Sequence, residues 1–196
     1  YQDLVWLNSK DRNKLYSQNF ANKLLGFSPI DKVCPKYTSS DAPDALGRAQ
    51  HTDLGFYMTE DVLVKVDRMS MAHSLEVRSP FLDHQVIEFA ASLPPRLKLN
   101  GQQGKVLLRH TAGKRLPSSV MQKPKQGFSI PAAKWLRGEL KEMAKDCIFE
   151  SNIIRDYLNP SEVKRIWQEH QSSSRDHNVF LWGLMMLGLW ERIWFQ

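Results

Sequence analysis

The chain has 196 residues and a mass of 22.7 kDa, the size of one ordinary domain, and 42% of its residues are hydrophobic, enough to bury a core. Its longest mostly apolar run, Val179 to Trp190, holds 12 residues, whereas a membrane-spanning helix needs roughly 20. Wholesale disorder and a transmembrane segment are therefore excluded, and the formal net charge of +6 makes the placement of the basic residues informative.

The first residues mix acids and bases and lack a basic segment leading into an apolar one, so we expect no signal peptide. The two cysteines, Cys34 and Cys147, stand 113 positions apart, which fits neither a disulfide framework nor a paired metal knuckle. We therefore expect a reducing, cytoplasmic setting and no structural zinc.

Apolar spacing and Pro/Gly punctuation predict helices joined by short connections, with no sustained strand alternation, so we expect a mainly α fold. Residues 35–52 are expected to form a loop and a short helix, and 117–131 a loop. The predicted helices span residues 11–25, 59–73, 84–91, 105–111, 131–148, 160–171 and 176–194.

Three polar residues are predicted to cap helices: Thr59, Asp83 and Asp176. The last predicted helix is apolar nearly all round, which indicates a buried core helix or an interface helix.

The positive charge is concentrated between residues 96 and 145, where twelve Lys and Arg accompany only Glu139 and Glu142. This segment carries +10 and the rest of the chain −4. Such a block indicates an anionic partner, which could be nucleotide phosphate, nucleic acid or an acidic protein surface, or else a solvated basic face.

Three groups of residues could carry chemistry. Asp61, Lys65 and Arg68 share one helix face, opposite an apolar stripe made of Val62, Val66 and Met69; such a ladder is most often solvated. Glu76 and Arg78 precede Ser79-Pro80-Phe81 and are expected to form a salt bridge that fixes a turn. Lys123 and Lys125 flank Pro124, with Gly127 following, so their ammonium groups would project from a rigid loop, toward solvent or toward an anion.

Several familiar motifs are absent from the sequence. It contains no Gly-Gly pair, P-loop, GxGxxG, CxxC, HExxH or G-x-S-x-G, and its six His are dispersed. The chain therefore has no phosphate cradle of its own, and metal-centred or triad hydrolysis is not expected.

Four blocks of sequence, in this order and spacing, carry a family resemblance. They are MTEDVLVKVDRMSMAHSLEVRSPFLDH at 58–84, GKVLLRH at 104–110, LPSSVMQKPKQGFSIPAAKWLRGEL at 116–140 and LWGLMMLGLWERIW at 181–194. Together they closely resemble the C-terminal half of the glutamine-dependent asparagine synthetases. The resemblance covers about residues 55–195, and 1–54 stands where the family has a variable helical lead-in segment, so we divide the chain into 1–54 and 55–196.

The resemblance implies a fold and an activity. The fold is the helical C-terminal part of an adenine-nucleotide α-hydrolase-like (α/β) synthetase domain, without most of its parallel sheet. The activity is ATP- and Mg²⁺-dependent conversion of aspartate, or another small carboxylate, to an amide through an acyl-adenylate, with ammonia from glutamine. Neither the SGG-x-DS phosphate loop nor the N-terminal glutaminase Cys is present, so the chain alone is expected to be catalytically incomplete and to need the missing glutaminase and nucleotide-binding parts.

The resemblance also implies roles for individual residues. Lys125 aligns with the family lysine that reaches the ATP phosphates and the reacting carbonyl, and Asp61 or its neighbour Glu60 with the family acid. Lys105 begins the GK-x-x-LR helix, where phosphate contact and structural pairing are equally expected. We assign Lys105, Lys123 and Gly127 to nucleotide binding and regard Arg78 and Asp83 as architectural.

A different class of function stays open: a non-enzymatic helical module that holds nucleic acid or an anionic partner with its basic block. Trp182, Trp190 and Trp194 lie away from the basic residues, which argues against nucleic acid. A homodimer is also left open.

Overall fold

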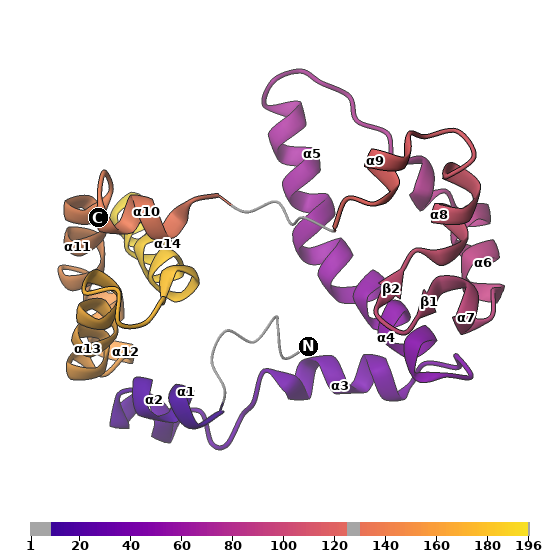
Figure 1. The fold of residues 1–196 in the computed structure, drawn as a ribbon. Helices are drawn as coiled ribbons and strands as arrows, with labels where there is room; N and C mark the ends of the chain where they lie inside the picture. The colour runs from indigo at the N-terminus through magenta and orange to yellow at the C-terminus, as the bar shows by residue number, and fades with distance from the viewer. Residues whose placement is uncertain (1–8, 125–129, 196) are drawn as a thin grey trace. The chain divides into compact units, whose positions relative to one another are not determined.

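The computed structural model describes residues 9–124 and 130–195 and is mainly helical, with one two-stranded sheet among these residues (Figure 1). The predicted mainly α fold is confirmed. The chain divides into two compact units. Unit 1 joins Tyr1–Phe27 to Gln126–Gln196, and unit 2 is the intervening Ser28–Lys125.

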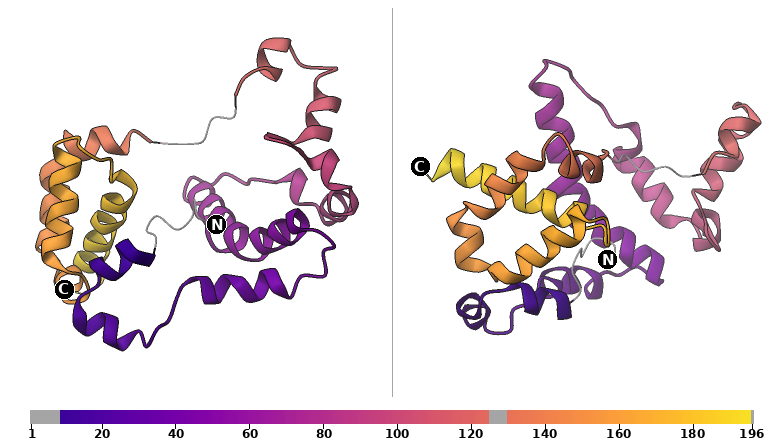
Figure 2. Two further views of the ribbon diagram at one scale, coloured as in Figure 1. Left: turned by 60° about the horizontal axis from the view of Figure 1, so that its bottom comes forward. Right: turned by 60° about the vertical axis from the view of Figure 1, so that its left-hand side comes forward.

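Unit 1 contains every buried hydrophobic side chain of the described residues. The long α14 packs against α10, α11 and α12 (Figure 2). The helices are α1 (Ser9–Leu15), α2 (Gln18–Lys23), α10 (Ala132–Arg137), α11 (Lys141–Phe149), α12 (Asn152–Tyr157), α13 (Pro160–Gln171) and α14 (Asn178–Trp194). The core is formed by Leu15, Leu136, Ala144, Cys147, Ile148, Ile154, Leu158, Val163, Ile166, Trp167, Leu181, Leu184 and Met185.

The prediction of a buried helix at the C-terminal end is confirmed for one face of α14. Leu181 and Met185 are buried there, and Gly188 lies so close to α11 that a Cβ would come within 2.1 Å of the Cys147 carbonyl oxygen. The opposite face leaves Met186 and Trp190 about half exposed.

The single helix predicted over 11–25 is wrong, because the chain breaks after α1. The Ser17 amide donates to the Tyr157 carbonyl at 2.9 Å, and the Ser17 hydroxyl accepts from the Phe20 amide to cap α2. Tyr16 forms a β-bridge with Leu158. These tertiary hydrogen bonds replace those a continuous helix would make.

The helix predicted over 131–148 is also two helices, since Gly138 stands between α10 and α11 with non-helical dihedral angles. α13 and α14 are confirmed. Asp176 accepts from the Asn178 amide, the first of α14, at 3.0 Å, but the helix begins two residues later than predicted and His177 occupies its N-cap position. The short α12 was not predicted; the Ser151 hydroxyl caps it, accepting from the Ile154 amide at 3.0 Å.

Unit 2 begins with α3 (Ile30–Thr38), followed by a continuous helical run of α4 (Ala45–Asp53), the π-helical segment η1 (Leu54–Val62) and α5 (Leu63–Met71). Thr59 is therefore not a cap, and that prediction is wrong: the apolar residues before it extend the helix, and Asp44 caps the run by accepting from the Gly47 amide at 2.9 Å. Residues 35–52 are more helical than expected. The division between residues 54 and 55 falls inside this run and stays a prediction about family segments.

The rest of unit 2 consists of short elements. They are η2 (Pro80–Leu82), α6 (His84–Ser92), α7 (Pro95–Lys98), β1 (Leu99–Asn100), β2 (Gln103–Gly104), α8 (Val106–Ala112) and α9 (Ser118–Met121). The antiparallel strands pair Leu99 with Gly104 and Asn100 with Gln103. Asp83 caps α6 as predicted, accepting from the Gln85 amide at 2.9 Å.

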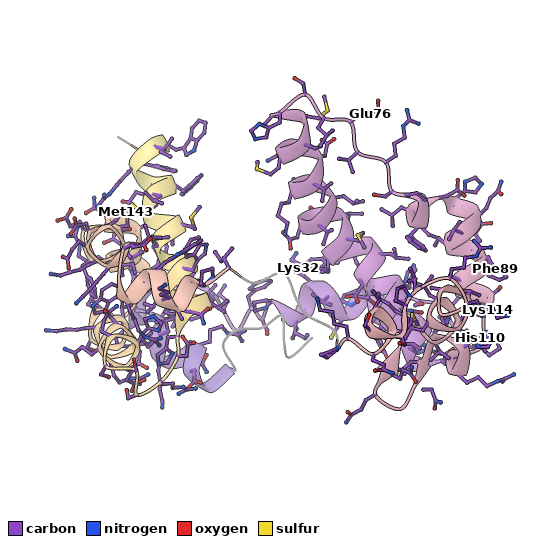
Figure 3. All side chains as sticks on the ribbon, turned by 45° about the horizontal axis from the view of Figure 1, so that its top comes forward. Lys32, Glu76, Phe89, His110, Lys114 and Met143 are labelled. Atoms are coloured by element: carbon purple, nitrogen blue, oxygen red, sulfur yellow. The ribbon has the colours of Figure 1, made fainter. Side chains whose placement is uncertain are left out.

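Unit 2 has almost no buried side chains of its own. Between residues 28 and 124 only Ser40 and Thr52 are buried, and both are polar. The predicted apolar stripe of α5 does not pack into a core, since Val66 is 38% and Met69 61% exposed. Figure 3 shows Phe89, on α6, which is 60% exposed. Across the described parts of the chain, no helix combines the length and apolar character needed to cross a membrane.

Candidate functional site

The two candidate acids lie in the last turn of η1. Both Glu60 and Asp61 are exposed, and Asp61 forms an ion pair with Lys65 at 3.6 Å. The side chains of that pair are 53% and 62% exposed, so solvent screens it and it contributes little to stability. The helix face that carries Asp61, Lys65 and Arg68 is solvated, and both Glu60 and Asp61 are accessible to a ligand.

Lys105 stands at the start of α8 in an unusual backbone conformation. Its φ of 58° and ψ of 39° lie in the left-handed region, which is uncommon for a residue with a Cβ. The Lys105 carbonyl nevertheless accepts the first helical hydrogen bond, from the Arg109 amide at 2.8 Å. The exposed side chain thus projects from a sharply defined turn between β2 and α8.

Lys123 follows α9 and is exposed. Its amide donates to the Val120 carbonyl at 3.3 Å, which continues the turn of α9 by one residue. The Arg109 guanidinium, on α8, donates through Nη1 to the Met121 carbonyl at 2.9 Å. The structure therefore brings together the helix that Lys105 begins and the turn that holds Lys123. Lys125 and Gly127 lie outside the described residues.

The acidic and basic parts of the predicted site do not touch directly. Within residues 9–124 and 130–195, no hydrogen bond or ion pair joins Glu60 or Asp61 to Lys105 or Lys123. In the same residues no group of three or more His, Cys, Asp or Glu is placed to hold a metal ion.

The predicted salt bridge after α5 is present. Arg78 donates through Nε to Glu76 Oε1 at 2.8 Å, and its Nη2 lies 2.6 Å from the same oxygen. The two side chains are 86% and 71% exposed, and Figure 3 shows Glu76 on the connection between α5 and α6. The pair braces the connection locally and leaves both side chains open to solvent.

A second polar cluster, in unit 1, was not predicted. Arg165 pairs with Glu162 and Glu169 on α13, and its hydrogen bond lowers the pKa of Glu162. His177 Nε2 lies 2.8 Å from Glu169, whose pKa is lowered by this hydrogen bond and by that from Arg165. The i+3 and i+4 spacing of the α13 residues could have indicated the first two pairs. Part of the cluster lines a cavity of about 230 Å³.

Comparison with known proteins identifies the family of the chain. Residues 2–192 match the family model described as asparagine synthase. The chain belongs to the asparagine synthase family. The match includes most of the lead-in segment 1–54 as well as the four blocks.

The curated relatives that the chain matches are much longer than the chain. A Mycobacterium tuberculosis (strain H37Rv) protein, provisionally named an asparagine synthetase (glutamine-hydrolyzing), is 36% identical over 178 residues, 88% of this chain and 27% of the relative. Asparagine synthetase (glutamine-hydrolyzing) 1 of Bacillus subtilis is 32% identical over 185 residues, 92% of this chain and 29% of that protein. The chain thus spans less than a third of these curated relatives. No solved structure matches it.

Proposed function

We propose that this chain is the C-terminal portion of an ATP-dependent ligase that forms an amide from aspartate or a related small carboxylate. The observation that carries the proposal is the family match over residues 2–192. In the proposed reaction a carboxylate oxygen attacks the α-phosphorus of ATP and pyrophosphate leaves. Ammonia from glutamine then attacks the acyl carbon, AMP leaves with the bridging oxygen, and the nitrogen loses a proton.

Lys125 is the proposed catalytic residue of this chain. Negative charge gathers on the phosphate oxygens in the first step and on the carbonyl oxygen in the second. A pre-placed ammonium group stabilises both without reorganising solvent. Asp61, or Glu60 beside it, is proposed to orient that ammonium group or to accept the proton from the incoming amine.

Lys105 and Lys123 are proposed to contact the nucleotide phosphates, and Gly127 is also assigned to nucleotide binding. Their exposure and the +10 charge of residues 96–145 support this assignment. We propose that the nucleotide binds together with Mg²⁺. A cytoplasmic location is likewise a proposal.

Two observations support catalytic incompleteness of the chain by itself. It spans under a third of its curated relatives, and residues 28–124 bury no apolar side chain. We propose that the remaining synthetase residues cover the apolar side chains of unit 2 and supply the phosphate loop, and that a glutaminase part supplies ammonia.

The test is a chimera in which this chain replaces the matching C-terminal residues of Bacillus subtilis asparagine synthetase 1. We expect AMP and asparagine to form in equal amounts from aspartate, ATP, Mg²⁺ and ammonium, while the 196-residue chain alone releases no AMP. A folded chimera that produces no amide, or turnover by the chain alone at about 1 s⁻¹, would contradict the proposal.

Lys125→Ala in the chimera tests the catalytic assignment. Loss of one pre-placed donor is expected to lower kcat by about 10²–10³-fold, with little effect on stability because the assigned role is contact with substrate rather than packing. Lys114→Ala is the matched control, since it removes the same charge from the same basic segment. Equal losses in both variants would replace the assignment with a general electrostatic effect.

A further inference from the structure

The short helix α9 cannot hold its own position. It has four residues, and its hydrogen bonds stay within one turn: the Val120 and Met121 amides donate to the Pro117 carbonyl and the Gln122 amide to that of Ser118. A helix of this length is not stable in water, because nucleation costs more than so few hydrogen bonds return. The orientation of α9 therefore depends on contacts with other elements.

Arg109 supplies the hydrogen bond that anchors α9. Among the described residues, its bond to the Met121 carbonyl is the hydrogen bond that connects residues 118–123 to another helix. The helices also approach closely here, since a Cβ added at Gly113 would lie 3.5 Å from the Met121 side-chain methyl group. Arg109 thus holds the end of α9 against the end of α8.

The charge of Arg109 is not balanced by a carboxylate. In the described part of the chain it has no ion pair, and its Nε is buried without a hydrogen-bond partner. Burying a guanidinium Nε without a hydrogen-bond partner costs free energy, so a neutral donor would join the two helices with a smaller loss of stability. Arg109 therefore joins α8 to α9 through a charged group whose Nε is left without a partner.

The position of Arg109 indicates its role. Lys105 and Arg109 are four residues apart, at the start and in the body of α8, so the same helix sets both side chains. Met121 in turn immediately precedes Gln122 and Lys123. One guanidinium therefore relates the turn at Lys105 to the turn that ends at Lys123.

We propose that Arg109 is a positioning residue, which fixes Met121–Lys123 relative to Lys105, two residues before Lys125 in the sequence. The expected effect of Arg109 on the rate of amide formation rests on the proposed function. Its effect on the position of Met121–Lys123 does not.

The geometric arm uses the 196-residue chain and needs no activity. We expect Arg109→Ala to raise the hydrogen-exchange rates of the Met121 and Gln122 amides by about tenfold or more, measured by NMR on the seconds timescale. Arg109→Lys, which keeps one donor, should restore most of the protection. Arg115→Ala, which removes an exposed cation from the same segment, should change nothing. Unchanged exchange in Arg109→Ala, or an equal rise in Arg115→Ala, would overturn the proposal.

The catalytic arm uses the chimera described above. Arg109→Ala is expected to lower kcat by about 10- to 100-fold while changing the KM for ATP far less, because misplacing a catalytic group affects the transition state most. Adding Lys125→Ala should then cost much less than it does in the parent chimera. A purely structural role predicts lower stability with an undiminished Lys125 effect, which would overturn the proposal. A parent chimera that makes no amide would refute the proposed function and leave the exchange result decisive for Arg109.

Discussion

His170 is the one fully buried titratable ring among the described residues, and it sits where three elements of unit 1 meet. Its Nδ1 accepts from the His177 amide at 3.2 Å and lies 3.2 Å from Asp176 Oδ1. Arg137 Nε donates to the His170 carbonyl at 2.7 Å, which ties α10 to α13. Burial, and then the Arg137 charge, lower the pKa of His170 below its ordinary value, against the opposing effect of Asp176.

This lowered pKa predicts that unit 1 loses stability in mild acid. Above about pH 6.5 the ring is neutral in the folded and unfolded chain alike. Below that value the unfolded chain binds the proton first, so the free energy of unfolding falls as the pH decreases toward the lowered pKa. Urea unfolding at pH 7.5 and 5.5 should show this loss.

The matched variants separate His170 from other groups. His170→Asn should reduce the loss of stability between the two pH values, whereas His110→Asn, at an exposed position, should leave it intact. A wild-type chain that is equally stable at both values would refute the role of His170.

At the scale of elements, the contact between α11 and α14 depends on a missing side chain. A Cβ at Gly188 would lie 2.1 Å from the Cys147 carbonyl oxygen and 2.8 Å from its carbonyl carbon. Both are backbone atoms inside α11, so neither can move aside as a side-chain end would. Gly188→Ala is expected to lower the free energy of unfolding by about 2–3 kcal/mol or more, measured in urea.

Met186→Ala on the same helix is the control for that substitution. Met186 is 48% exposed, so its truncation should cost less than about 1 kcal/mol. If Gly188→Ala left the free energy of unfolding unchanged, the two helices would separate more easily than this close approach implies.

The elements predicted correctly from the sequence have local causes. Asp83 caps α6 and Asp176 accepts from the first amide of α14, each through its own side chain. The failures have distant causes. The break at Ser17 follows from hydrogen bonds to residues 140 positions away in sequence, such as Tyr157, and Thr59 carries a cap signal inside a helix that apolar residues extend.

The candidate site shows the same division. Motif spacing indicated which cations to consider and which acids, because residue type and order are local properties. It could not indicate that Arg109 reaches the Met121 carbonyl, since the GK-x-x-LR pattern does not specify which strand or helix lies beside it. Nor could it indicate that Lys105 adopts a left-handed conformation.

At the scale of the whole chain, the two units differ in what holds them together. The buried apolar side chains among the described residues all belong to unit 1, where burial of each Val, Leu, Ile or Met contributes on the order of 1.5–3 kcal/mol. The helices of unit 2 retain their hydrogen bonds but expose the apolar residues that would offset the entropy of ordering them. The isolated chain should therefore unfold in two stages, with unit 2 first.

The distribution of aromatic residues makes this prediction measurable. All six tryptophans lie in the sequence ranges of unit 1, so tryptophan fluorescence reports unit 1, whereas far-ultraviolet circular dichroism reports helices in both units. In a urea titration of the 196-residue chain, part of the helical signal should disappear before the fluorescence changes, because the two transitions belong to different cooperative units. Leu181→Ala, which empties a fully buried position, should move the fluorescence transition to lower urea and leave the early loss of helix in place. Coincident transitions by both probes would show instead that unit 2 shares the cooperative core of unit 1.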